Sequence, residues 1–404
     1  MEPYTRITLV FAVFSMAVVL VDPIFALYLT QEGYGTIEIT VLLSAFALAG
    51  MVAAPLLGGM SDHWGRRPII LAGILFAMIA YSLYAFINNP IVIFLARILE
   101  GIAYVAVILA AIAKMEDIVV NEKTKKASTR VGMSLSIGKI GHVVGPLLGG
   151  IIATYYGIIS PFLAAVIVLG IIGIWYFFQK HNTHPIPKLR ELTFNPIPLV
   201  QEFWKNKPLR GLSALVITHQ FSISVLFVFL PLFMVKDLGY SIELVGIALF
   251  VKEVPQLIQF LAGKLTDSWG SKHVVILGTT LCGVSMVALS FFHTFDWILV
   301  ALFVYGMGGS LMGISTIALL SGFAEQTKQE GSFLGSHVAI SRIGAFLGFI
   351  ISGIVVQLTS IPTLFAVAGT LILVGIVIGE EYLASHTFYL PKPKHLLSAL
   401  FHHR

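Results

Sequence analysis

Residues 58–68 read GGMSDHWGRRP and separate two apolar runs, residues 37–58 and 69–88, with almost no loop between them. Each run is long enough to cross a membrane as a helix, which takes about 20 residues. The stretch recurs in the second half of the chain, where residues 263–270 read GKLTDSWG. Gly, Asp, Trp and Gly therefore repeat at an offset of 205 residues (263 less 58). This repeat predicts a tight turn between two membrane helices in each half of a duplicated chain.

The composition of the 404 residues favours a membrane protein. Hydrophobic residues make up 57% and charged residues 11%, whereas soluble domains have about 45–50% and about 25%. These values exclude a soluble enzyme, a disordered chain and a nucleic-acid-binding module. The single Cys282 excludes an internal disulfide and a cysteine-rich metal site. We expect no cofactor and no bound metal.

Twelve apolar runs follow one another along the chain, and none has the alternating pattern of a barrel strand. We therefore predict an all-α membrane protein with twelve transmembrane helices in two pseudo-symmetric six-helix halves. The predicted spans are residues 7–30, 37–58, 69–88, 90–113, 131–154, 160–179, 211–235, 242–263, 273–292, 295–321, 333–357 and 361–383. The predicted units are the first half (1–180), a linker (181–210), the second half (211–384) and a tail (385–404). The linker is expected to contain a short amphipathic helix, Leu199 to Trp204.

Lysine and arginine residues predict the orientation. With both termini on the cytoplasmic side, inner loops and ends contain 20 of the 25 basic residues, and the outer loops contain only Lys236. Because basic residues concentrate in cytoplasmic loops, we expect a multi-pass protein of the cell membrane whose termini, linker and tail are cytoplasmic. We expect the lipid bilayer to surround the membrane-spanning helices.

A second repeat lies in the fifth and eleventh predicted spans. Gly141, Gly145 and Gly149 recur every four residues, which gives a helix face that another helix can approach closely. Pro146 removes one backbone hydrogen bond from the same helix. The matching positions, at an offset of 203, are Gly132 with Gly335, Gly141 with Gly344, Gly145 with Gly348, Gly150 with Gly353, and Lys139 with Arg342. Duplicated six-helix halves are typical of transporters that alternate access between their halves.

In the turn motif the chain resembles the major facilitator superfamily, whose signature loop reads Gly-x-Leu-Ala-Asp-Arg-x-Gly-Arg-Arg or close to it. Met60 and His63 depart from that pattern, as do Ser271 and Lys272 in the second copy. Asp62 is placed to accept hydrogen bonds from a helix N-terminus. The resemblance implies that this loop latches the two halves together on the cytoplasmic side. The residues of the predicted latch are Gly58, Asp62, Gly65, Arg66, Arg67, Asp267 and Gly270.

The glycine-proline stretch resembles the fifth-span motif of drug–proton antiporters in the same superfamily. The residues that carry it are Gly132, Gly141, Gly145, Pro146, Gly149 and Gly150. The resemblance implies a monomer that exports a small organic solute in exchange for protons. The alternative explanation of the motif is close packing of helices without a role in antiport.

Seven charged residues lie inside the predicted spans, and burying each costs about 2.5–3.5 kcal/mol. All seven lie within about 6 Å of the centre of their span, at a rise of 1.5 Å per residue. They therefore predict a charged belt at the depth where transporters bind substrate and coupling ion. The residues are Asp22, Arg97, Glu100, Lys139, Lys252, Glu253 and Arg342.

Helical spacing predicts which members of the belt meet. Arg97, Glu100 and Tyr104 share a face, so Arg97 can pair with Glu100 or instead with Asp22. The superfamily typically carries Arg-x-x-Gln-Gly there, so Glu100 adds an acid. The spacing also predicts a polar stripe of Lys252, Gln256 and Gln259, and a shared face for Lys139 and His142.

From these positions we predict two sets of functional residues. The proton-coupling candidates are Asp22, Glu100, Glu253, His219 and His142, with Asp22 foremost because desolvation favours the neutral carboxyl. The candidates for the substrate cavity are Arg97, Tyr104, Lys139, Lys252, Gln256, Gln259 and Arg342. The alternatives are that the ion pairs are structural and that the histidines are satisfied core residues.

The balance of charge bears on the substrate. Three acids face four bases, and pairing leaves Lys139 and Arg342, which favour an anionic or amphipathic solute. The rival is that these two cations pair with Glu253 and Asp22. A proton-coupled symporter that imports an organic anion or a sugar is the second hypothesis. A receptor or scaffold that transports nothing is the third, and the sequence lacks the motifs of hydrolases, zinc proteases and phosphate-binding loops.

Overall fold

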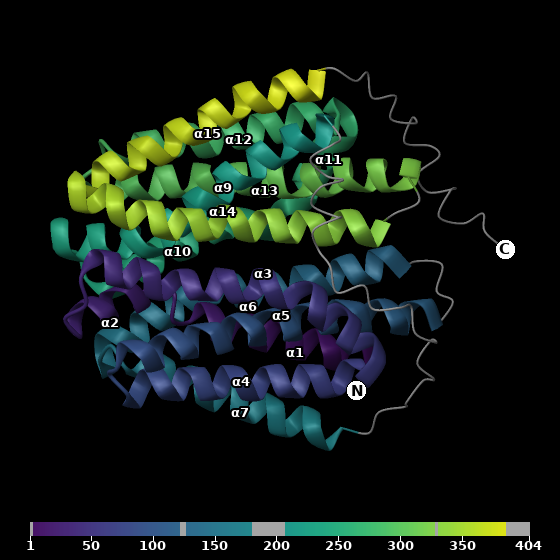
Figure 1. Cartoon of the computed structure of the whole chain (residues 1–404), viewed down its shortest axis with the longest axis horizontal. Coiled ribbons are helices and arrows are strands. Elements are labelled where there is room, and N and C mark those ends of the chain that lie inside the picture. The colour runs from purple at the N-terminus through teal and green to yellow at the C-terminus, as the bar shows by residue number, and fades with distance from the viewer. Residues whose placement is uncertain (1–2, 122–126, 180–206, 328–329, 385–404) are drawn as a thin grey trace.

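The computed structural model describes residues 3–121, 127–179, 207–327 and 330–384, and these residues form helices and no strand (Figure 1). The all-α prediction is therefore confirmed. The helices of the first half are α1 (Pro3–Val19), α2 (Phe25–Gln31), α3 (Thr36–Trp64), α4 (Arg66–Phe86), α5 (Pro90–Asn121), α6 (Ala127–Tyr156) and α7 (Ser160–Phe178). Those of the second are α9 (Lys207–Leu232), the π-helical η1 (Phe233–Asp237), α10 (Ile242–Glu253), the 3-10 helix η2 (Val254–Ile258), α11 (Gln259–Trp269), α12 (Ser271–Leu289), α13 (Phe295–Thr327), α14 (Glu330–Leu358) and α15 (Ile361–Ala384).

Within the described ranges, ten helices are long and apolar enough to cross a membrane, and α1 is a shorter apolar helix. The predicted multi-span architecture is thus confirmed, whereas the number twelve stays a prediction. The predicted linker helix and the tail lie outside the described residues. α9 begins at Lys207, a few residues before the predicted start of the second half.

Two spans that the sequence predicts as single helices are broken. The first is interrupted at residues 20–24, between α1 and α2, and the eighth changes to 3-10 geometry at Val254–Ile258. Pro23 and Pro255 lie in these breaks, and proline lacks the backbone N–H that a continuous helix needs. Each break lies beside a charged residue of the predicted belt, Asp22 or Glu253.

The predicted tight turns are present in both halves. Gly65 alone separates α3 from α4, and Gly270 alone separates α11 from α12. Their φ angles are 91° and 87°, in a region that residues with a side chain rarely adopt. The duplicated motif therefore gives the same backbone in both copies.

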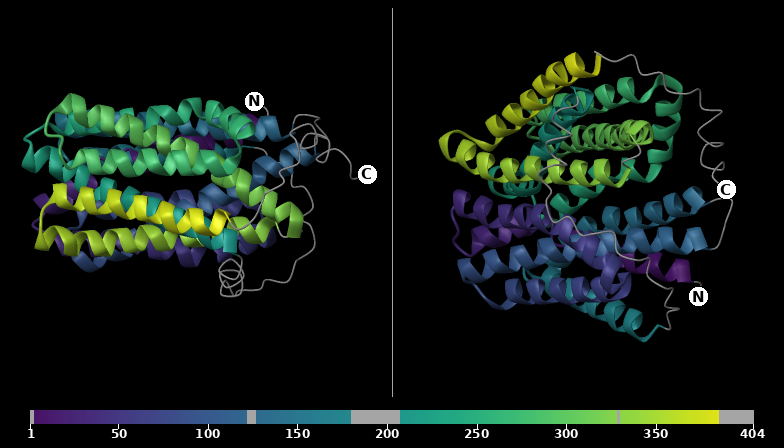
Figure 2. Two further views of the ribbon diagram at one scale, coloured as in Figure 1. Left: turned by 90° about the horizontal axis from the view of Figure 1, so that it is seen from above. Right: turned by 45° about the vertical axis from the view of Figure 1, so that its right-hand side comes forward.

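The two halves form separate groups of helices that meet along α3 with α14 and along α6 with α10 (Figures 1 and 2). Inside the first half, α5 packs on α3 and α4, and α6 packs on α1. In the second half, α13 packs on α12, and α14 packs on α9. The start of α1 and the end of α15 lie at the same end of the bundle, which we call the terminal face.

The glycine face predicted on the fifth span is the contact surface for the first span. A Cβ added to Gly141 would lie 2.2 Å from the carbonyl oxygen of Ala12, and one added to Gly149 would lie 1.8 Å from that of Leu20. The second half repeats this contact, because a Cβ on Gly344 would lie 2.6 Å from the carbonyl oxygen of Ile217. Only glycine permits such close approach of the backbones.

Further close contacts join the halves toward the face opposite the terminal face. A Cβ on Gly150 would lie 2.9 Å from the Cα of Gly246, and one on Gly353 would lie 2.1 Å from Thr40 Oγ1. The ribbons of the two halves are closest at this end and separate toward the terminal face (Figure 2).

Candidate functional site

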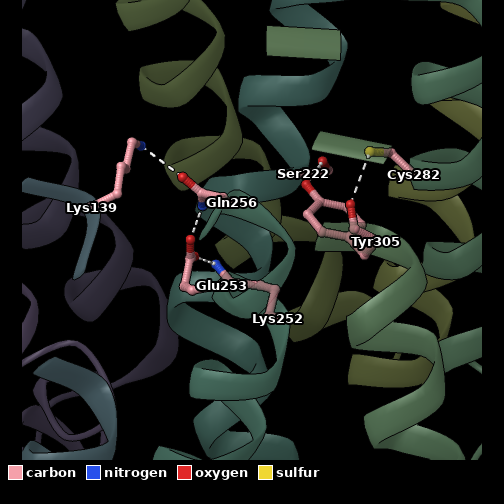
Figure 3. Close-up of polar contacts among 7 residues, drawn as sticks. All are labelled: Lys139, Ser222, Lys252, Glu253, Gln256, Cys282 and Tyr305. Atoms are coloured by element: carbon pink, nitrogen blue, oxygen red, sulfur yellow. Dashed lines mark hydrogen bonds and ion pairs between the residues drawn. The ribbon is translucent and has the colours of Figure 1, made fainter. Parts of the chain in front are cut away.

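A chain of polar contacts links the two halves at mid-length (Figure 3). Lys139 Nζ, on α6 of the first half, donates a 2.7 Å hydrogen bond to Gln256 Oε1 on η2 of the second. The Gln256 amide donates in turn to Glu253, whose other oxygen forms a 2.6 Å ion pair with Lys252 Nζ. A cation from one half is thereby connected to an ion pair of the other.

The local fold explains these contacts. α10 ends at Glu253, and the chain continues in the 3-10 turn that contains Pro255. A 3-10 helix has 3.0 residues per turn, so Gln256, three residues after Glu253, lies above it. The predicted stripe assumed one continuous α-helix, whereas the helix changes to 3-10 geometry at Val254–Ile258. Gln256 joins the network, whereas Gln259 makes no hydrogen bond to the other described residues of it.

Arg97 and Glu100 form the second polar centre, wholly within the first half. Arg97 NH1 lies 2.7 Å from Glu100 Oε2, and both residues are only 3% exposed. The carboxylate also accepts hydrogen bonds from Tyr81 (3.1 Å) and Tyr84 (2.8 Å) on α4. Of the two predicted partners of Arg97, the structure thus selects Glu100. The tyrosines were missed because the sequence gives no sign that an apolar span turns two hydroxyls toward another helix.

Asp22 lies in the break between α1 and α2, between the two polar centres. It is close enough to Lys252, Glu253, Glu100 and Arg97 to interact with all four electrostatically. Gly149 packs directly on this break, because a Cβ there would meet Leu20 and Pro23. The glycine face of α6 therefore holds the backbone that carries the carboxyl.

Arg342 reaches from α14 into the first half. Its guanidinium carbon lies 5.4 Å from the ring centre of Phe46 and 5.3 Å from that of Tyr104. The guanidinium carbon of Arg97 lies 4.9 Å from the ring centre of Phe46, so both arginines pack against the same ring. Within the described ranges no carboxylate forms an ion pair with Arg342. The rival arrangement, in which Arg342 pairs with Asp22, is not formed among the described residues.

The two histidines lie in different surroundings. His142 on α6 is half-buried and interacts electrostatically with Glu253, Lys139 and Lys252, so it belongs to the charged network. His219 on α9 stacks on Tyr305, with ring centres 5.9 Å apart and planes at 16°. The Tyr305 hydroxyl lies 2.6 Å from Ser222 Oγ (Figure 3). Nothing in the sequence links Tyr305 to His219, because they lie on separate spans.

Comparison with known proteins decides the family. The sequence model described as the Major Facilitator Superfamily matches residues 7–251 and 212–401. The chain belongs to the Major Facilitator Superfamily. It is therefore a membrane transporter and not an enzyme.

Three known proteins are similar to this superfamily chain. An uncharacterized MFS-type transporter of Methanocaldococcus jannaschii is 27% identical over 368 residues, 88% of this chain and 92% of the relative. The class B tetracycline resistance protein of Escherichia coli is 28% identical over 327 residues, 76% of each chain. The crystal structure of the nucleoside transporter NupG has a TM-score of 0.79 with 14% identity and covers 96% of this chain and all of that one, which shows the shared fold.

The superfamily loop makes its described contacts inside the first half. Arg66 Nε lies 3.2 Å from Asp117 Oδ2 on α5. Arg67 donates to the carbonyl oxygen of Phe177 on α7. Asp267 of the second copy is exposed. A latch between the halves through this loop stays a prediction.

Some predicted positions of this superfamily member fall outside what the structure describes, namely the side chain of Asp62 and the packing around Gly58 and Gly132. Among the described residues, no group of three or more His, Cys, Asp or Glu side chains could hold a metal ion.

Proposed function

We propose that the chain is a proton-coupled antiporter that exports a small organic solute by alternating access. The observation that carries the proposal is the contact of Lys139 with the Gln256–Glu253–Lys252 group. It joins the halves at mid-length, and it must break if the halves rock apart on that side. Transporters bind substrate and coupling ion at this depth.

Asp22 is the proposed site of the transported proton. Its position in a helix break beside both polar centres lets movement of the halves change its access to water and to the cations. A protonated carboxyl also avoids the cost of carrying a bare charge through a closed intermediate. Glu253 and His142 are the proposed relay, because both belong to the network that Lys139 joins.

Relatives support the direction of transport. A relative named for tetracycline resistance acts on a compound that harms the cell, and export of the compound gives such resistance. The glycine-proline motif of the fifth span is also typical of the antiporter branch, and here Gly141 and Gly149 hold α6 against the first span.

The solute is proposed to carry an anionic group. Arg97 and Lys252 have carboxylate partners, whereas Lys139 donates to a neutral amide and Arg342 lies over two aromatic rings. Two cations at matching positions of the halves would bind a carboxylate between them.

The proposal includes the arrangement in the membrane. We assign twelve spans, with α1 and α2 together as the first and α6 as the fifth, and both termini on the cytoplasmic side of the cell membrane. The described contacts between the halves lie at mid-length or toward the opposite face, so we assign this conformation as closed on the outer side of the membrane. We assign a monomer.

Reconstitution into liposomes with an internal pH dye tests the proposal. We expect tetracycline or benzoate, added as probes, to drive proton movement through the wild-type chain. Asp22→Asn should abolish this movement, because an amide cannot release a proton. Asp296→Asn, which changes an exposed acid at the start of α13, is the matched control. Normal proton exchange in Asp22→Asn would overturn the assignment of that residue.

A further inference from the structure

A cavity of about 190 Å³ lies in the second half and is open on one side, where Ile317 is 52% exposed. It is formed by α9, α13 and α14, and no helix of the first half lines it. Its polar lining consists of His219, Gln220, Thr316, His337 and Ser341. His337 and Ser341, one turn apart on α14, share a face.

The lining offers hydrogen bonds that the protein does not use. Thr316 is 3% exposed, and its Oγ1 has no hydrogen-bond partner among the described residues. The same is true of His219 Nε2. These two atoms are shielded from water, whereas the side chains of Gln220 and His337 line the cavity, are half-buried and make no hydrogen bond among the described residues. A ligand group that bonds to these side chains is therefore favoured in this cavity.

The lining also selects against a charged group. None of the described lining residues is an acid, a lysine or an arginine, so these residues supply no counter-charge for an ion that enters. A neutral imidazole carries one donor and one acceptor, and the Gln220 amide carries both as well. Met312 and Ile317 supply apolar surface. The cavity therefore suits an uncharged planar group that both donates and accepts.

The cavity lies near enough to the ionic network for one solute to reach both. Lys252 interacts electrostatically with His219, whose ring stacks on Tyr305. We infer that this cavity binds an uncharged, hydrogen-bonding aromatic part of the transported solute. The inference rests on the proposed function, because the same solute would place its charged group among the cations between the halves.

The native sequence provides a direct test of occupancy. Cys282 is the only cysteine and is buried, so Ser341→Cys in a Cys282→Ala background places one reactive thiol at the cavity. Labelling of the reconstituted full chain by N-ethylmaleimide is then measured with benzamide, benzoate or benzylammonium present. We expect benzamide to slow labelling and its two charged analogues to have little effect. Equal effects of all three probes, or none from benzamide, would overturn the inference.

Two glycines give a matched pair of variants. Nothing lies within 4 Å of a Cβ added at Gly313, which lines the cavity, or at Gly263 on α11, which does not. Both sites therefore accept a larger side chain without strain. Gly313→Leu should fill the cavity and remove protection by benzamide, whereas Gly263→Leu should keep it. Protection that survives Gly313→Leu would place benzamide elsewhere.

A further variant tests the hydrogen bonds. His219→Phe keeps a ring against Tyr305 but removes both nitrogens, so benzamide affinity should fall about tenfold. His219→Gln, which keeps a donor and an acceptor, should restore part of it. Unchanged affinity in His219→Phe would contradict the assignment.

Proton movement in the same liposomes separates this inference from the proposed function. Protection by benzamide without any solute-driven proton movement would overturn antiport and leave the binding cavity. Proton movement without protection would overturn the cavity and leave antiport.

Discussion

The two halves share one scaffold but carry different chemistry at equivalent positions. α5 and α13 correspond at the offset of 205, since they begin at Pro90 and Phe295. α5 has the ion pair of Arg97 with Glu100, whereas the equivalent positions of α13 are Leu302 and Tyr305. The first half is ionic there and the second is neutral.

The difference extends to the groups around each centre. Glu100 accepts two tyrosine hydroxyls in addition to its arginine, and this centre is almost fully buried. The hydroxyl of Tyr305 contacts Ser222. His219, which stacks on Tyr305, lines the cavity, and its Nε2 has no hydrogen-bond partner among the described residues. Arg97 Nε likewise has no hydrogen-bond partner among the described residues, so each centre keeps one buried polar atom unpaired, and the two centres differ in their charge and in the cavity beside His219.

The cations that reach between the halves differ in the same way. Lys139 and Arg342 occupy matching positions, and each extends toward the opposite half. Lys139 meets an amide beside a carboxylate, whereas Arg342 meets two aromatic rings. A duplicated backbone therefore does not require duplicated binding chemistry.

The largest expected effect tests a place where the described scaffolds of the two halves differ in packing. Gly149 corresponds to Ser352 at the offset of 203, and a Cβ at Gly149 would lie 1.8 Å from the backbone oxygen of Leu20. Gly149→Ser should cost more than the roughly 1–3 kcal/mol typical of overpacking and prevent recovery of folded protein. Ser352→Gly should cost under about 1 kcal/mol. Size-exclusion profiles in detergent measure both, and a well-folded Gly149→Ser variant would contradict the close contact at the break.

The next effect compares the equivalent polar centres. Glu100→Ala leaves Arg97 buried without its counter-ion and should destabilise the protein by about 3–5 kcal/mol. Tyr305→Phe should cost about 1 kcal/mol, because Ser222 keeps its 2.7 Å bond to the carbonyl oxygen of His219. Thermal unfolding in detergent gives both values. The double variant Arg97→Met with Glu100→Leu should be less destabilised than Glu100→Ala. The opposite order would show that the unpaired charge of Arg97 does not cause the destabilisation.

A smaller effect is expected in proton movement, and it distinguishes the role of Arg342 from that of Lys139. Arg342→Glu should reduce benzoate-driven proton movement at least about tenfold, because it reverses the cation that has no described carboxylate partner. Lys139→Gln should reduce it less, because Lys252 remains nearby. The control is Lys264→Glu, which reverses an exposed charge on α11. Unaltered kinetics in Arg342→Glu would discard the anionic substrate.

The sequence predicts the scaffold well because the scaffold depends on local rules. Apolar length predicts the membrane helices, Gly65 and Gly270 predict the turns, and the repeat of Gly141 and Gly145 predicts a close helix contact, whose partner the structure shows to be α1. The helix breaks were missed. A proline such as Pro255 is visible in the sequence, but whether it kinks the helix or changes it to 3-10 geometry depends on the packing around it.

The site was predicted less well, because its contacts join separate helices. The spacing of Arg97 and Glu100 on one helix predicted their pairing as one of two alternatives, with Asp22 as the other partner of Arg97, and the structure has Glu100. The contacts of Glu100 with Tyr84 and of Arg342 with Phe46 join different helices, and no spacing in the sequence encodes them. The cavity beside His219 needs three helices in place and has no counterpart in sequence pattern.

The smallest effect tests the shared scaffold itself. Gly65→Ala and Gly270→Ala each place a Cβ on a backbone with φ near 90°, a strain of about 1–3 kcal/mol. Equal losses of thermal stability are expected, because the two turns have the same conformation, although Arg66 and Arg67 make contacts that Ser271 and Lys272 do not share among the described residues. A much larger loss for Gly65→Ala would show that the first turn also positions Arg66 and Arg67. The halves would then differ in their turns as well as in their polar centres.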